Sequence, residues 1–130
     1  MRGRWEKVSN KPLVIADVAH NEEGFKEVVF EIKRIKSQRK IFVLGFVKDK
    51  PIEKIIKLFP KDGIYFFSSP KISRALSLEY LDLILKNTDI NYRIFESIEE
   101  AYNRAIDSAS KEDFIFIGGS NFTVSEILNP

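Results

Sequence analysis

Two short runs of this sequence, Ile41–Leu44 and Phe114–Ile117, are apolar at every position. A strand with one face in water alternates apolar and polar residues, whereas a strand covered on both faces has no such need. Both runs therefore predict strands buried between two layers of helices. At 130 residues the chain is long enough to bury one core of this kind. We expect a single domain over residues 1–130.

The other apolar runs alternate with helical patterns. We predict strands over residues 13–18, 41–46, 64–67, 92–95 and 114–117, and helices from about 22, over 51–59, over roughly 75–87 and after Ser97. Ser97 and Glu100 have the spacing of a capping box. The predicted fold class is α/β, a three-layer sandwich around a mostly parallel, doubly wound sheet of about five to six strands. Strand order does not follow from these patterns.

Composition narrows the function classes. The charges nearly balance, with 21 Lys and Arg against 19 Asp and Glu, which does not indicate binding to nucleic acid or to a membrane surface. The chain has no cysteine and one histidine, so no metal site is predicted. It has no apolar run long enough for a signal peptide or a membrane span. A cytoplasmic location is expected.

Polar and charged residues cluster where the predicted strands end. In a parallel sheet those ends meet at one edge, where α/β proteins bind their ligands. The turns in question are Asp17–Asn21, Gly45–Lys50, Ser68–Arg74 and Gly118–Asn121. They supply an imidazole, several cations, carboxylates, hydroxyls and backbone amides.

Each of these turns also has a purely structural interpretation. Asn21 has the position of a helix N-cap, and Asp17 has the position to accept backbone donors within its own turn. The charges at 48–50 are consistent with a solvated cluster, and Gly118 and Gly119 with a tight turn that needs positive φ. Ligand-binding and structural roles both remain open for these residues.

Several common nucleotide-binding patterns are missing. The first strand is not followed by G-x-G-x-x-G, and no G-x-x-x-x-G-K-[ST] occurs. A phosphoacceptor signalling domain needs an aspartate after the third strand and a lysine after the fifth. The chain has Ser68-Ser69 and Gly118-Gly119 there.

Five segments, taken in order, resemble the C-terminal domain of folylpolyglutamate and dihydrofolate synthases, which belong to the Mur ligase family. They are Gly3–Glu6, the D-x-A-H-N pattern at Asp17–Asn21, Gly45 with Asp49-Lys50, Arg74-Ala75, and Gly119–Phe122. The family pattern has proline where this chain has Arg2 and Glu22, and aspartate where it has Pro51.

This resemblance implies an ATP-dependent ligase. Such enzymes activate the carboxylate of a folate or of dihydropteroate as an acyl phosphate, and the amine of L-glutamate then displaces phosphate. The resemblance implies that ATP and Mg²⁺ act in the full-length enzyme and that other domains carry the phosphate loop, the magnesium ligands and most of the pteridine site. This chain would be the last third, inactive alone, in a monomeric enzyme.

The resemblance also assigns roles to residues. Arg4 and His20 match catalytic positions, Arg4 at the ATP phosphates and His20 beside the acyl phosphate, while Asp17 and Asn21 join Arg4 in binding the nucleotide. The residues implied for glutamate are Lys50, Ser120, Asp49 and Arg74. Two alternatives stay open: the C-terminal domain of a cell-wall muramyl ligase, and a stand-alone α/β binding module without catalysis.

Overall fold

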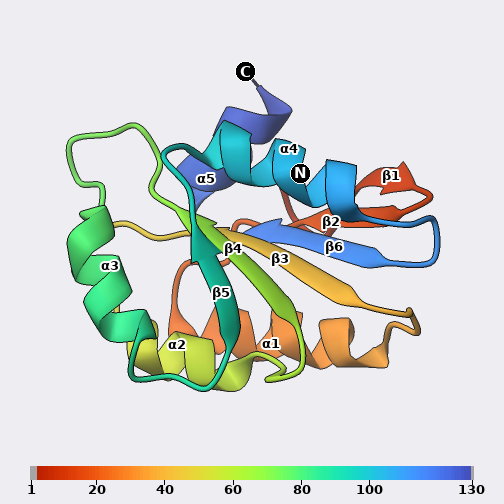
Figure 1. The fold of residues 1–130 in the computed structure, drawn as a ribbon, viewed down its shortest axis with the longest axis horizontal. Coiled ribbons are helices and arrows are strands. Elements are labelled where there is room, and N and C mark those ends of the chain that lie inside the picture. Colours follow the sequence, from red (N-terminus) through yellow and green to blue (C-terminus); the bar gives the residue numbers. More distant parts are fainter. Residues whose placement is uncertain (1–2, 130) are drawn as a thin grey trace.

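The computed structural model describes residues 3–129, so Arg2 lies outside the described residues. Within this range the chain forms six strands and five helices (Figure 1). In chain order they are β1 (Glu6–Asn10), β2 (Leu13–Ala16), α1 (Glu22–Arg34), β3 (Lys40–Gly45), α2 (Ile52–Leu58), β4 (Ile64–Ser68), α3 (Leu78–Leu85), β5 (Asn91–Ile94), α4 (Ile98–Ser108), β6 (Phe114–Gly118) and α5 (Asn121–Leu128).

The sheet has the strand order β1-β2-β6-β3-β4-β5. Every neighbouring pair from β2 to β5 is parallel, and β1 runs antiparallel beside β2 at one edge. Helices α1, α2 and α3 cover one face, and α4 and α5 cover the other (Figure 1). The predicted three-layer, mostly parallel architecture is confirmed.

The central strands carry the core, as their apolar runs predict. Residues 41–44 and 114–117 have no exposed surface. Phe42 stacks on Tyr65 with ring centroids 4.5 Å apart, and Phe59 meets Phe42 edge-on at 5.5 Å. These rings fill the layer under α1 and α2, while small residues such as Ala101 and Ala105 let α4 lie close to the opposite face.

Two elements and several boundaries differ from the sequence prediction. Strand β1 was not predicted, because an edge strand with only part of its surface covered needs no apolar run, and residues 6–10 are all either partly or fully exposed. Helix α5 was not predicted either. The helix predicted over 75–87 spans only Leu78–Leu85, since Ala75 forms a β-bridge with Val47 and Ser77 is the N-cap. The predicted cap at Ser97 is confirmed, because its hydroxyl accepts from the Glu100 amide.

An ion pair between the half-exposed Arg39 and the buried Asp113 joins the amino ends of β3 and β6, at the opposite ends of these strands from the turns discussed above. The Asp113 carboxylate accepts four hydrogen bonds, from the Ser110 amide and from the backbone, Nε and Nη2 of Arg39. Asp113 is 2% exposed. The Arg39 guanidinium holds the pKa of this carboxyl below its ordinary value of 3.8.

Because the folded state lowers the pKa of Asp113, the pair stabilises the fold above about pH 4. That contribution is lost as the pH falls through the folded-state pKa. We expect Asp113→Asn to lower the free energy of unfolding by about 2 kcal/mol at neutral pH, with the difference from the wild type shrinking below pH 4. Urea unfolding at a series of pH values measures this. A difference that stays constant into acid would contradict the assigned role.

No helix among residues 3–129 is long and apolar enough to cross a membrane.

Candidate functional site

The turn that follows β2 is closed by the carboxylate of Asp17. Its Oδ1 accepts a hydrogen bond from the Ala19 amide and its Oδ2 accepts one from the Trp5 amide, both at 2.8 Å. The Val18 amide donates to the Gly3 carbonyl at 2.7 Å. The structural interpretation of Asp17 is therefore correct, and the residue joins the 3–5 segment to the turn. Its contact with a ribose stays a prediction.

Asn21 begins α1. Its Oδ1 accepts from the Gly24 amide at 2.9 Å, so the N-cap interpretation is confirmed. The capped helix end points its remaining amides toward the turn, where the positive end of the helix dipole favours an anion. The contact of Asn21 with a nucleotide stays a prediction.

His20 is exposed and lies between two cavities. One, of about 360 Å³, is bordered by the N-terminal segment and the β2–α1 turn, and we name it the Arg4 cavity. The other, of about 320 Å³, is bordered by the turns after β3, β4 and β6, and we name it the Lys50 cavity. The Arg4 cavity is lined by the residues predicted to bind the nucleotide, Arg4, Asp17 and Asn21. The Lys50 cavity is lined by the residues predicted to bind glutamate, Asp49, Lys50, Arg74 and Ser120.

Cations dominate the Lys50 cavity. Lys48, Lys50 and Arg74 line it, with Asp49 as the carboxylate among them. The two loops that carry these residues are joined by a hydrogen bond from the Lys48 amide to the Arg74 carbonyl at 2.8 Å. The Arg74 guanidinium also lies 5.7 Å above the ring of Phe122. Lys48 and Asp49 are exposed to solvent and Lys50 is partly buried, and all three line this one cavity.

Ser120 is buried and has a structural role. Its Oγ accepts from the Thr123 amide at 3.1 Å and lies 3.0 Å from the Thr123 hydroxyl, so it caps α5. Only 3% of the residue is exposed, although it borders the Lys50 cavity. That Ser120 holds a carboxylate stays a prediction, and the first two residues of α5 line the same cavity.

The ends of β3 and β6 are in backbone contact. Gly119 has a φ of +108°, and a Cβ built on it would lie 2.4 Å from the Gly45 carbonyl oxygen. The Thr123 hydroxyl donates to that same carbonyl at 2.8 Å. The tight-turn interpretation of Gly119 is therefore confirmed. Thr123 is a supporting residue that the sequence analysis missed, and its position three residues after a capping serine is the only signal for it.

The turn after β4 brings fewer side chains to the candidate site than its composition suggests. The Ser68 hydroxyl donates to the Phe95 carbonyl at 2.7 Å, and the Ser69 hydroxyl donates to the Leu76 carbonyl. Both serines are therefore used to hold the turn, and Arg74 is what this segment brings to the site. Within residues 3–129 there is no cluster of three or more acidic or histidine side chains able to hold a metal ion.

The chain is similar to known proteins in sequence. A family model described as "Mur ligase, glutamate ligase domain" matches residues 3–121. The chain is 37% identical over 131 residues to the dihydrofolate synthase/folylpolyglutamate synthase of Buchnera aphidicola subsp. Acyrthosiphon pisum, covering 98% of this chain and 31% of that protein. It is 29% identical over 138 residues to a UDP-N-acetylmuramoyl-L-alanyl-D-glutamate–2,6-diaminopimelate ligase of Buchnera aphidicola subsp. Baizongia pistaciae, covering 98% of this chain and 27% of that protein.

Solved structures match the fold as well. Escherichia coli FolC in complex with ADP superimposes with a TM-score of 0.87 at 28% identity, over 98% of this chain and 31% of that one. A bifunctional folylpolyglutamate synthase/dihydrofolate synthase with Mn, AMPPNP and L-glutamate bound gives a TM-score of 0.87 at 26% identity, over 98% and 31%. The chain thus spans less than a third of the length of these relatives. On the match of residues 3–121 and the shared fold, the chain belongs to the Mur ligase glutamate ligase domain family.

Proposed function

We propose that this chain is the C-terminal domain of an ATP-dependent folylpolyglutamate or dihydrofolate synthase. In that role it helps to close the ATP site and binds incoming L-glutamate. The observation that supports this most directly is the place of His20 between two cavities, one with Arg4 and a helix N-terminus, the other with three cations. An enzyme that joins a phosphorylated acid to an amino acid needs two such neighbouring sites.

The Arg4 cavity has the chemistry of a phosphate site. A guanidinium forms strong paired hydrogen bonds with phosphate oxygens, and the N-terminus of α1 attracts negative charge. Arg4 would thereby neutralise charge that builds up as the γ-phosphate leaves ATP. Asp17 already accepts two backbone amides. A ribose hydroxyl would donate to the lone pairs of the Asp17 carboxylate that these two amides leave available.

The Lys50 cavity has the chemistry of an amino-acid dicarboxylate site. Lys50, Arg74 and Lys48 supply cations for two carboxylates, and Asp49 supplies an acceptor for the ammonium group. His20 stands at the boundary between the two cavities. From there its imidazole would donate to the phosphate of the activated acid, or orient the glutamate amine that attacks the acyl carbon and releases phosphate.

Titration of the isotope-labelled chain with L-glutamate tests this proposal. We expect amide NMR shifts to concentrate on the turns that border the Lys50 cavity, with Lys50→Ala weakening the response and Lys57→Ala, an exposed lysine on α2, leaving it unchanged. The isolated chain is expected to show no ligase turnover. Shifts spread evenly over the surface, or equal responses in both variants, would contradict glutamate binding at this cavity.

A second ligand separates the two branches of the family. 2,6-Diaminopimelate carries a second ammonium group, which the cations of the Lys50 cavity would repel. We therefore expect weaker shifts with diaminopimelate than with L-glutamate at equal concentration. The reverse order would favour the muramyl ligase alternative.

A further inference from the structure

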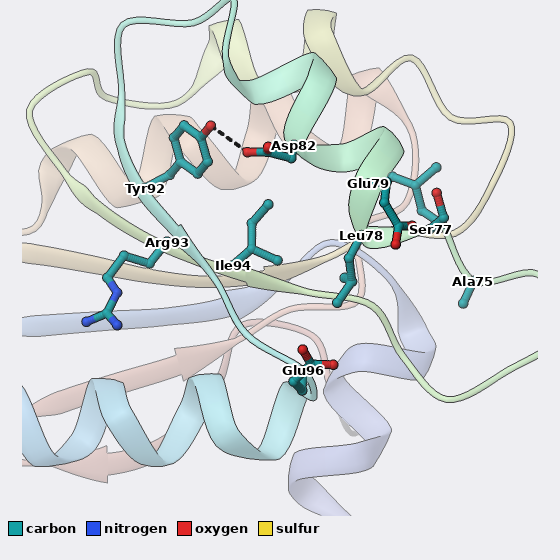
Figure 2. A pocket seen from close by; sticks show the side chains of 10 residues that line it. Ala75, Ser77, Leu78, Glu79, Asp82, Tyr92, Arg93, Ile94 and Glu96 are labelled. Atoms are coloured by element: carbon teal, nitrogen blue, oxygen red, sulfur yellow. Dashed lines mark hydrogen bonds between the residues drawn. The ribbon is translucent and has the colours of Figure 1, made fainter.

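A further cavity of the described residues lies away from the proposed ligase site. It is a groove of about 880 Å³ between α3 and β5, shown in Figure 2. Leu78 and Ile94 point into it from opposite walls. The Tyr92 hydroxyl donates to Asp82 at 2.8 Å across its far end. We name this the α3–β5 groove.

One wall of the α3–β5 groove is an open edge of the sheet. Within residues 3–129, β5 pairs only with β4. The Phe95 amide donates to the Phe67 carbonyl of β4 at 2.8 Å. Because successive residues of a strand direct their backbone groups to opposite sides, the amides and carbonyls of Tyr92 and Ile94 face away from β4. A row of free backbone groups is a template for another extended chain.

The charges around the groove are mostly negative. Glu79, Asp82 and Glu96 line it. Hydrogen bonds from Tyr92 and Lys86 keep the pKa of Asp82 below its ordinary value, and Lys86 pairs with it at 3.3 Å, so Glu79 and Glu96 are the carboxylates that would meet a bound cation. Arg93 also borders the groove, but its guanidinium lies 5.3 Å over the ring of Phe95, on the α4 side of the sheet. Figure 2 shows the Arg93 side chain directed away from α3. Lysine or arginine side chains of a bound chain would therefore meet carboxylates.

We propose that the α3–β5 groove binds an extended, lysine- or arginine-rich segment of another protein, which adds to the sheet as a strand beside β5. The four residues of β5 allow pairing over about 13 Å at roughly 3.3 Å per residue. Backbone pairing would supply affinity, and alternate side chains would contact Leu78 and Ile94 or the carboxylates. This binding does not depend on the proposed ligase function.

A labelled peptide of alternating lysine and valine is the probe. We expect saturable binding by fluorescence anisotropy, weakened about tenfold or more in the variant Glu79→Lys/Glu96→Lys. The matched control Glu31→Lys/Glu112→Lys makes the same change in net charge at exposed positions outside the groove, and should bind as the wild type does. Circular dichroism checks that both variants are folded.

The backbone contribution is tested on the peptide, which leaves the protein intact. Methylation of alternate peptide nitrogens on the edge that faces β5 should abolish binding, whereas methylation on the opposite edge should leave it unchanged. Equal binding by both methylated peptides would overturn strand addition. Equal loss in the two charge-reversal variants would also overturn the proposal. Sedimentation experiments provide a third test. If the wild type self-associates and only the groove variant does not, the groove binds a second copy of this chain, and the proposal is overturned.

Discussion

Replacement of Gly119 by alanine is expected to lower the free energy of unfolding by about 3–4 kcal/mol, enough to unfold much of a marginally stable domain. Two costs add. The backbone at Gly119 has a φ of +108°, which side chains rarely tolerate, and the new Cβ would lie 2.4 Å from the Gly45 oxygen and 2.9 Å from its nitrogen. Neither contact is with a flexible side chain, so relief requires the two turns to separate.

Thermal or urea unfolding measures this effect, with Gly24→Ala as the matched control. Gly24 lies in α1, where alanine is favoured by up to about 1 kcal/mol. Its nearest contacts would be at 3.3 Å, to Ala19 and to the Asn21 side chain. We expect Gly24→Ala to stay within about 1 kcal/mol of the wild type. If the two variants prove equally stable, the contact between Gly45 and Gly119 is not the constraint described here.

The second large effect is on catalysis and depends on the proposed function. In the full-length synthase that the proposed function implies, His20→Ala is expected to lower kcat/KM by about 100-fold, the usual scale for loss of a positioned proton donor or acceptor. The thermal midpoint should not change, because His20 is exposed and caps nothing. Steady-state kinetics with L-glutamate as the varied substrate, together with a melting curve, provide both numbers.

Lys57→Ala again serves as the control for an exposed cation outside the site. His20→Gln adds a finer test, because it keeps a hydrogen-bond donor but cannot carry a proton at neutral pH. Partial recovery in His20→Gln would indicate orientation of the amine, and no recovery would indicate proton transfer. An unchanged kcat/KM in His20→Ala would remove this residue from the mechanism.

The buried strands could be predicted because a strand covered on both faces is apolar at every position. Uninterrupted apolar runs such as 41–44 and 114–117 are typical of strands covered on both faces. The helix starts at Asn21 and Ser97 could be predicted because both side chains accept hydrogen bonds from amides of the first helical turn. The sequence patterns of strand β1 and helix α5 are weaker. β1 is half exposed, and α5 buries only Thr123 and Val124, so neither has the periodicity on which such predictions depend.

The sequence predicted which residues form the candidate site, but not how they are divided between two cavities. Parallel strands bring their carboxyl ends to one edge, so Asp17, Lys50 and Arg74 were expected to meet there. The division into two cavities that share His20 depends on strand order, which no local pattern encodes. The capping role of Ser120 was missed for the related reason that α5 itself was not predicted.

The hydrogen bonds of Asp17 have a mechanical consequence. Its carboxylate holds the amide just after Arg4 and the amide just before His20, each at 2.8 Å. A displacement of the 3–5 segment would therefore act on the β2–α1 turn through this side chain and through the hydrogen bond from the Val18 amide to the Gly3 carbonyl. Because Arg4 and His20 each adjoin a residue held by this carboxylate, we expect a movement of the domain to carry the two side chains together.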